Sequence, residues 1–262
     1  MKFQKTVLLT GATGAIGKAI AMKIAEKGYH TILAVRNEAK AKSLVNEIKS
    51  NTGNQNIDYA LVDLSLKDPI RQLSEKIDIP IHVLINNAAT TPKQKLESSE
   101  GVEMQWAVNV LGYFRMINNF TPHLIQSGEG RIINVASYWA GGLDLNDPEF
   151  KHRPYNNDTA YRQSKQANRM LTNAFAENLA TNGIDVYTCH PGDVNSQLSN
   201  NLGFGGNESP EEGASTPVWL ATENKTTLLS GKFYAKNKVQ HCQFSQNKEA
   251  ISELFSLCRR YG

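Results

Sequence analysis

Cysteine is scarce in this sequence, with three residues among 262, and these lie far apart at Cys189, Cys242 and Cys258. They form no CxxC pair and no Cys/His cluster, and the six histidines show no metal-ligand spacing either. An odd number of scattered cysteines argues against a disulfide framework and is typical of proteins in a reducing compartment. We therefore expect a cytoplasmic protein with no metal site.

Long apolar runs and an excess of one charge are also absent. No segment is apolar for long enough to cross a bilayer, and the first predicted strand begins at Lys5, which leaves no length for a signal peptide. The 28 Lys and Arg residues are interspersed with 25 Asp and Glu residues, for a formal net charge of +3. We therefore expect no membrane anchor and no nucleic-acid partner.

No linker-like stretch divides the chain, so residues 1–262 are expected to form one domain. Apolar segments of strand type alternate with segments of helix type. This alternation predicts an α/β fold, a single-domain, Rossmann-type, doubly wound parallel sheet flanked by helices on both faces. Two irregular stretches, at about 138–158 and 195–210, are expected to be substrate loops, although the second could equally be a plain disordered loop.

The expected elements can be given by residue. Strands are predicted at Lys5–Thr10, His30–Val35, Ile57–Val62, Ile81–Ile85, Arg131–Ala136, Ile184–Cys189 and Gly231–Ala235. Helices are predicted, among others, at 99–126, at Glu211–Thr222 and at Asn247–Tyr261. Pro122 should kink the first of these or end it early, and Ser209 with Glu212 forms a capping box at the start of the second.

A glycine-rich turn follows the first strand. Gly11, Gly14 and Gly17 separate that strand from a helix that should end at Gly28, which is the context of a dinucleotide fingerprint. Glycines permit the tight turn and let backbone N–H groups approach a pyrophosphate, which the helix N-terminus also attracts. The alternative is a glycine-rich turn without a ligand.

The ends of the second and third strands bear on the choice of cofactor. An acidic residue after the second strand binds the ribose 2′-hydroxyl of NAD, whereas an arginine accommodates the 2′-phosphate of NADP. Positions 34–37 contain no Asp or Glu, and Arg36 is well placed to pair with a phosphate, so we expect NADP(H). Asp63 could bond the adenine amino group, or it could simply cap the following turn.

Tyr161 and Lys165 open a helical segment that continues to Asn182. Residues four apart project from the same helix face, with Cβ atoms about 5–6 Å apart. A nearby ammonium is expected to lower the pKa of a phenol, which suits it to general acid–base catalysis on an alcohol or carbonyl. Such pairs also occur on many solvated helices without any role.

Two further polar residues lie where chemistry is expected. Ser137 follows a predicted strand, at the edge of the sheet where ligands bind in open α/β folds. Asn109 falls in a mixed-polar part of its helix, where a buried amide could kink the helix and hold a water. It could instead make only a packing hydrogen bond.

Taken together, these motifs resemble the short-chain dehydrogenase/reductase (SDR) family over nearly the whole chain. The shared features, in the family's order, are Thr10 to Gly17, Asn86 to Ala89, Asn109, Ser137, Tyr161 with Lys165, and Pro191-Gly192. The resemblance implies a catalytic tetrad in which Tyr161 is the acid or base and Ser137 bonds the substrate oxygen. Lys165 would bind the nicotinamide ribose, and Asn109 would hold a water. The implied cofactor-binding residues are Gly11, Thr13, Gly14, Ile16, Gly17, Arg36, Asp63, Leu64, Asn87, Tyr161, Lys165, Pro191 and Val194.

A narrower resemblance points to the retinol dehydrogenase and protochlorophyllide reductase branch. Residues 138–160, 23 in all, separate Ser137 from Tyr161, more than in most members, and segments 160–168, 212–214 and 230–234 look similar too. The branch acts on bulky apolar alcohols and carbonyls, mostly with NADP(H), and many members are membrane-anchored. We expect a soluble relative.

The family commonly pairs through helices that start near 99 and 158, so a homo-oligomer, dimer or tetramer, is one expectation. Four apolar residues could serve that interface or pack on the chain's own sheet: Met170, Leu171, Phe175 and Leu179. The chain departs from the family pattern at Ala15, Ala89 and Ser196. If position 15 required a positive φ, Ala15 would be strained.

The expected function is an NADP(H)-dependent oxidoreductase that reduces an aldehyde or ketone on a mainly apolar small molecule. Tyr138, Trp139 and the two irregular loops would wall its pocket. One alternative is a dehydrogenase that oxidises a retinol- or hydroxysteroid-like alcohol. A second, from another class, is a non-catalytic protein that senses NADPH through the same fold.

Overall fold

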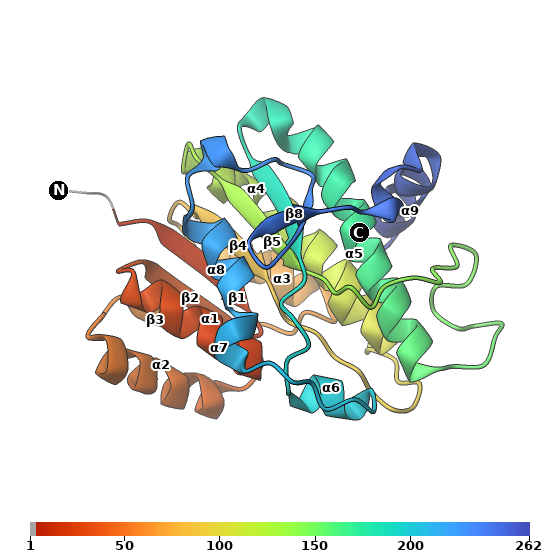
Figure 1. The fold of residues 1–262 in the computed structure, drawn as a ribbon, viewed down its shortest axis with the longest axis horizontal. Coiled ribbons are helices and arrows are strands. Elements are labelled where there is room, and N and C mark those ends of the chain that lie inside the picture. The colour runs from red at the N-terminus through yellow and green to blue at the C-terminus, as the bar shows by residue number, and fades with distance from the viewer. Residues whose placement is uncertain (1–3) are drawn as a thin grey trace.

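The computed structural model of the protein describes residues 4–262, whose centre is an eight-stranded sheet (Figure 1). Its strand order is β3-β2-β1-β4-β5-β6-β7-β8, and all neighbours are parallel except the antiparallel pair β7 and β8. The strands are β1 (Thr6–Thr10), β2 (His30–Val35), β3 (Ile57–Leu61), β4 (Val83–Asn86), β5 (Arg131–Val135), β6 (Asp185–Cys189), β7 (Phe233–Ala235) and β8 (Lys238–Gln240). The predicted doubly wound α/β fold is confirmed.

Helices cover both faces of this sheet (Figure 1). The helices are α1 (Ala15–Glu26), α2 (Glu38–Thr52), α3 (Lys67–Lys76), η1 (Trp106–Leu111), α4 (Gly112–Gln126), α5 (Asn157–Leu179), η2 (Ala180–Asn182), α6 (Gln197–Asn201), α7 (Pro210–Gly213), α8 (Ser215–Thr222), η3 (Lys225–Thr227), η4 (Gln243–Ser245) and α9 (Lys248–Arg260). Of these, η1 is a π-helix and the other η segments are 3-10 helices.

Two apolar cores lie on opposite faces of the sheet, because successive strand residues point in opposite directions. Leu8 belongs to the core under α3, α4, α5 and α9, whereas its neighbours Val7 and Leu9 belong to the core under α1, α2 and α8. Both faces of the central strands are therefore buried, which explains their continuous apolar sequences.

The helix predicted at 99–126 was wrong at its start. Helical structure begins only at Met104, because the Glu103 carboxylate accepts the backbone N–H groups of Gln105 (2.9 Å) and Trp106 (2.7 Å) and caps the helix there. Pro122 lies inside α4, which runs on to Gln126, so it does not end the helix early.

Two elements near the C-terminus also differ from expectation. The predicted helix Glu211–Thr222 is divided at Ala214 into α7 and α8, because Pro217 has no N–H to donate to the carbonyl of Gly213. Its Ser209/Glu212 capping box is confirmed. Strand β8 was missed, because the turn before it uses Lys236 and Asn237 at positive φ (51° and 57°) without the glycine that usually signals a hairpin.

The C-terminal helix α9 packs beside α5 (Figure 1). The ring of Phe255 lies 5.2 Å from the rings of both Phe114 and Phe175. Four residues of α5 are buried in the same core as Leu254 and Leu257 of α9, namely Met170, Leu171, Phe175 and Leu179. The residues considered for a subunit interface are therefore packed within this chain.

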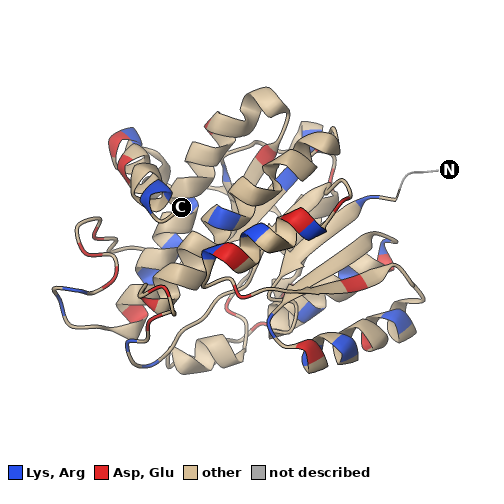
Figure 2. Ribbon diagram, turned by 180° about the vertical axis from the view of Figure 1, so that it is seen from behind, with Lys and Arg blue, Asp and Glu red and all other residues tan. Residues whose placement is uncertain are grey.

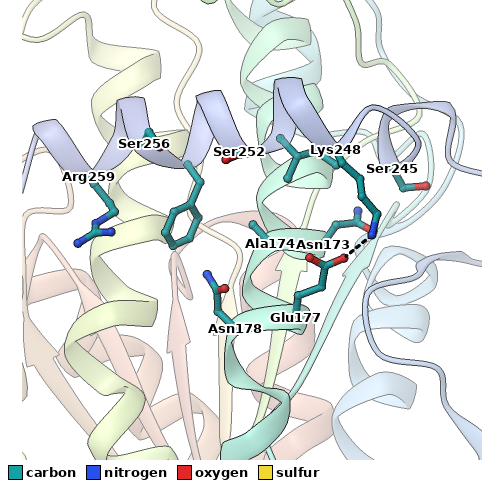
Figure 3. A pocket seen from close by; sticks show the side chains of 11 residues that line it. Asn173, Ala174, Glu177, Asn178, Ser245, Lys248, Ser252, Ser256 and Arg259 are labelled. Atoms are coloured by element: carbon teal, nitrogen blue, oxygen red, sulfur yellow. Dashed lines mark ion pairs between the residues drawn. The ribbon is translucent and has the colours of Figure 1, made fainter.

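A polar groove of about 340 Å³ borders the contact between α5 and α9 (Figure 3). In this groove Lys248 pairs with Glu177 at 3.6 Å.

Charges of both signs share the surface helices, as seen from behind the molecule (Figure 2). On α2 and α3, Lys and Arg residues alternate with Asp and Glu residues. Among residues 4–262, no helix is both long and apolar enough to span a membrane. The same residues contain no group of three His, Cys, Asp or Glu side chains that could hold a metal ion.

Candidate active site

Several of the residues predicted to bind cofactor line one cavity at the carboxyl ends of β1, β2 and β3. The cavity has a volume of about 360 Å³. It is lined by Gly11, Thr13, Ala34, Val35, Arg36, Val62, Asp63, Leu64, Ala88, Ala89, Thr90, Pro92, Leu96, Met104 and Val108. Sequence reasoning missed its apolar wall of Leu96, Met104 and Val108, because no motif marks these residues and they reach the cavity only through the fold.

The glycine turn is shaped by close backbone approach. Gly11 has φ +69°, and a Cβ there would lie 2.6 Å from the Cα of Ala88. A Cβ at Gly17 would overlap the carbonyl oxygen of Gly11. Gly14 is the N-cap of α1 and no side chain caps that helix, so its N-terminus presents backbone N–H groups to the turn. Ala15 is the first helical residue and has no positive φ, so the expected strain is absent.

Asn86 and Asn87 tie the strand ends together. Asn86 Nδ2 donates to Asn134 Oδ1 (3.0 Å), which links β4 to β5. Asn87 Nδ2 donates to the carbonyls of Thr10 (3.1 Å) and Gly11 (3.2 Å), while the Thr10 hydroxyl accepts the Asn87 N–H (2.9 Å). The two amides thus join neighbouring strands and hold the glycine turn against β4.

Arg36 and Asp63 differ in their surroundings. Arg36 is exposed beside the cavity and forms no ion pair with any other residue in 4–262. Asp63 Oδ1 accepts the backbone N–H (2.9 Å) and the hydroxyl (2.6 Å) of Ser65. Asp63 thus caps the following turn. It also lies on the cavity wall, and its contact with an adenine amino group stays a prediction.

Ser137, Tyr161 and Lys165 meet beneath the carboxyl end of β5. All three side chains are buried, and the Ser137 hydroxyl is close enough to the Tyr161 phenol to lower its pKa. Lys165 Nζ donates to the carbonyl of Val135 (3.0 Å) and lies 5.5 Å from the centroid of the Tyr161 ring. Helix α5 supplies the Tyr and the Lys four residues apart, as their spacing predicted.

Asn109 joins this group indirectly. It lies in the π-helix η1, where its Oδ1 accepts the Thr90 N–H (2.8 Å) and its Nδ2 donates to the Thr90 carbonyl (3.1 Å). Its Nδ2 also donates to the hydroxyl of Ser164, the residue before Lys165 (3.3 Å). Asn109 therefore connects the cavity wall at Thr90 to helix α5, and π-helical turns often occur at functional sites.

Burial controls the protonation of the Tyr–Lys pair. It raises the pKa of Tyr161 to about 12, and the nearby Ser137 hydroxyl opposes this rise only in part. Burial also lowers the pKa of Lys165 to about 7, with the nearby Cys189 thiol opposing this change. The expectation that Lys165 lowers the pKa of Tyr161 is contradicted, because removal from water disfavours both the ammonium and the phenolate.

Pro191, Val194 and Ile16 lie around Gly213, the last residue of α7. Pro191 lines a second cavity of about 470 Å³, away from Arg36 and Asp63. A Cβ at Gly213 would overlap Val194 and would lie 3.5 Å from Ile16 Cγ1 and 3.6 Å from the Pro191 carbonyl oxygen. Gly213, which sequence reasoning did not assign to the site, therefore lets these three residues come together.

The second irregular loop is ordered against the first. Residues 197–201 form the short helix α6, capped by Ser196 and Ser199, where the sequence suggested a lid or a disordered loop. The rings of Trp139 and Phe204 lie 4.6 Å apart, and Asn157 Nδ2 donates to the Asn201 carbonyl (3.2 Å). The two predicted loops thus form one wall beside Ser137.

A glycine turn and a cavity at the carboxyl ends of parallel strands are the arrangement of dinucleotide-binding folds, and known proteins resemble this chain over most of its length. A model of the short chain dehydrogenase family matches residues 5–204. Human (Homo sapiens) retinol dehydrogenase 13 is 32% identical over 88% of this chain and 76% of its own. Human retinol dehydrogenase 11 is 30% identical over 95% of this chain and 82% of its own length. Human polyprenol dehydrogenase is 28% identical over 96% of this chain and 83% of its own length. The chain belongs to the short-chain dehydrogenase family, in its retinol dehydrogenase-like branch.

Solved structures share the fold at lower sequence identity. An uncharacterized protein from Mycobacterium Paratuberculosis superimposes with a TM-score of 0.81 at 24% identity, covering 98% of this chain and 92% of that one. A 3-oxoacyl (acyl-carrier-protein) reductase from Agrobacterium tumefaciens, solved with NADP bound, gives a TM-score of 0.70 at 23% identity, covering 87% and 91%.

Proposed function

We propose that the protein is an NADP(H)-dependent oxidoreductase that reduces an aldehyde or ketone on a mainly apolar small molecule. The observation that carries this proposal is the buried group of Ser137, Tyr161 and Lys165 at the same sheet edge as the cavity that contains Arg36. A phenol, a hydroxyl and an ammonium are the groups that proton transfer to a carbonyl oxygen requires.

The cavity residues fit a nicotinamide dinucleotide. The Gly11–Gly17 turn leaves room for close backbone approach, and the uncapped N-terminus of α1 can receive the pyrophosphate. The exposed guanidinium of Arg36, which forms no ion pair within residues 4–262, suits a 2′-phosphate, which favours NADP(H) over NAD(H). When bound, the nicotinamide would supply or accept the hydride. The remaining cofactor contacts, by Thr13, Asn87, Pro191 and Val194 among others, are proposed from the family pattern.

The protonation of Tyr161 favours the reductive direction at neutral pH. With a pKa of about 12, its phenol holds a proton that it can donate to a substrate oxygen as the carbonyl becomes an alcohol. The Ser137 hydroxyl would donate a hydrogen bond to the same oxygen. Asn109 would keep η1 and α5 in register, and Lys165 would orient the cofactor ribose. Oxidation of an alcohol needs the phenolate form of Tyr161, so the rate of oxidation should increase relative to the rate of reduction as pH rises.

Aromatic side chains support an apolar substrate. Tyr138 and Trp139 are 49% and 37% exposed beside Ser137, and the Trp139–Phe204 contact closes the wall between the two loops. The names of two relatives, retinol dehydrogenase and polyprenol dehydrogenase, refer to apolar alcohols. A cytoplasmic location and a homo-oligomer stay predictions.

The test is a kinetic screen of apolar aldehydes and ketones with NADPH and with NADH, on the wild type and on Arg36→Asp. We expect turnover with NADPH, and a loss of the preference for NADPH by at least about tenfold in the variant, since a charge-assisted phosphate contact is removed. Tight NADPH binding without turnover of any carbonyl or alcohol would instead favour the non-catalytic NADPH sensor. An unchanged cofactor preference in Arg36→Asp would contradict the role of Arg36.

A further inference from the structure

The turn that carries Ser137 is held by contacts that the family motifs did not predict. Residue Tyr138 donates its backbone N–H to His190 Nδ1 at 3.2 Å. Trp139 donates its backbone N–H to the Ser137 hydroxyl oxygen at 3.0 Å, and Arg169 Nη1 reaches the Ser137 carbonyl at 3.5 Å. Because Trp139 occupies an acceptor site of the hydroxyl, the O–H proton is left to point elsewhere. These bonds fix the direction in which the Ser137 side chain projects.

His190 is itself rigidly placed. Its backbone N–H donates to the Tyr234 carbonyl on β7 (2.9 Å), and its side chain is buried. Its ring lies 4.5 Å from the ring of Tyr138, which also contacts Phe233 at 5.3 Å. Since Nδ1 accepts a hydrogen bond, the neutral ring carries its proton on Nε2, on the side of Asp193. The imidazole thus links β7 to the turn after β5.

We propose that His190 is a positioning residue: by accepting the Tyr138 N–H, it sets the turn so that the Ser137 hydroxyl faces the Tyr161 phenol. The inference rests on the proposed function, because it assigns a role in the same reaction. A histidine that merely fills space at this point would affect stability alone. A positioning histidine affects the rate of proton transfer, because small displacements of a catalytic hydroxyl reduce the rate steeply.

Burial, with a smaller contribution from two nearby cations, keeps the His190 ring neutral. Burial lowers the pKa of His190 to about 4; Asp193 opposes this, and Arg169 of α5 and Lys236 of the β7–β8 turn reinforce it. Glu208 and Glu212 line the same cavity as His190. Protonation would place a hydrogen on Nδ1, opposite the Tyr138 N–H, and would break the bond. Turnover should therefore fall as pH is lowered toward about 4, through loss of the Ser137 position.

Two substitutions separate the hydrogen bond from the packing of the ring. His190→Phe keeps a ring against Tyr138 but removes the acceptor, whereas His190→Asn places an amide oxygen near the position of Nδ1 and cannot titrate. We expect His190→Phe to lower kcat by at least about tenfold while the NADPH Kd stays within about twofold. His190→Asn should keep kcat within about threefold of wild type. Because asparagine does not titrate, this variant should also lose the part of the fall in kcat at low pH that protonation of His190 causes.

Amide hydrogen exchange supplies a readout that does not depend on turnover. The Tyr138 amide should exchange faster in His190→Phe than in wild type and in His190→Asn, which should match each other. A wild-type kcat in His190→Phe, or equal losses of kcat in both variants, would overturn the inference while leaving the proposed function intact. If the wild type turns over no substrate, the proposed function fails. In that case an unchanged Tyr138 exchange rate in His190→Phe would still refute the positioning contact.

Discussion

Tyr161 and Lys165 illustrate how burial decides the chemistry of a pair whose spacing was plain in the sequence. Their separation by four residues predicted that they share a helix face, and they do. It could not predict that both would be enclosed, which raises the pKa of the phenol and lowers that of the ammonium. Burial depends on residues distant in sequence, such as Val135 and Tyr113, which pack over Lys165. The protonation states therefore follow only from the fold.

The first prediction concerns the Tyr161 phenol in the cofactor-free protein. With a pKa of about 12, it should contribute almost no phenolate absorbance below about pH 10, the pH at which exposed tyrosines are about half ionised. An ultraviolet titration of wild type minus Tyr161→Phe isolates its signal. A phenolate in the difference spectrum between about pH 7 and 9 would show that Lys165 lowers this pKa after all.

The second prediction uses Lys165. Its pKa falls from 10.5 in the unfolded chain to about 7 in the native state, so between these values the unfolded state binds more protons. The contribution of Lys165 to stability therefore rises with pH across this window. Lys165→Met, which cannot titrate, should be more stable than wild type near pH 7, by an amount that shrinks as pH approaches 10.

The measurement is urea unfolding of both proteins at several pH values. Lys232→Met is a suitable control, since Lys232 is exposed. A stability difference between Lys165→Met and wild type that stayed constant from pH 7 to 10 would contradict the low pKa of Lys165.

At the scale of elements, the glycine turn was the most predictable part of the site. The order strand, turn and helix was apparent from Thr10 to Gly17, and β1 and α1 fall where expected. The helix start at Met104 was not predictable, because Glu103 caps it through a local carboxylate contact that no spacing rule captures. The hairpin of β7 and β8 was missed for a related reason, since Lys236 and Asn237 adopt positive φ without a glycine.

A matched pair of glycine substitutions tests the shape of this turn. Gly17→Ala should destabilise the protein by about 1–3 kcal/mol, because its Cβ would overlap the Gly11 carbonyl oxygen and force the backbone to move. Gly14→Ala should cost far less, because its Cβ would lie 3.5 Å from the same oxygen, an ordinary contact. Urea unfolding compares the two, and equal losses would show that the turn is looser than described.

At the scale of the whole molecule, the C-terminal helix α9 completes the core that supports helix α5, which carries Tyr161 and Lys165. Sequence pattern predicted an amphipathic closing helix but not its partner, because the partner depends on how the chain folds back. Leu254 of α9 is fully buried against the rest of this core. The rings of Phe114, Phe175 and Phe255 form the outer part of the same contact.

Leu254→Ala should therefore destabilise the protein by about 2–5 kcal/mol, through the lost apolar burial and the cavity left behind. Glu253→Ala on the exposed face of the same helix should change stability by less than about 0.5 kcal/mol. Thermal and urea unfolding measure both. A small effect of Leu254→Ala would mean that α9 is not part of the cooperative core.

The central claim is that Tyr161 donates the proton in a carbonyl reduction. The most direct test takes one apolar carbonyl compound that the wild type reduces and compares its turnover by wild type and by Tyr161→Phe. Phenylalanine keeps the ring and removes the only proton that the side chain can donate. We predict that kcat falls by at least about a hundredfold, the contribution of a positioned acid, while the NADPH Kd is unchanged. Full turnover by Tyr161→Phe with NADPH bound would contradict the account.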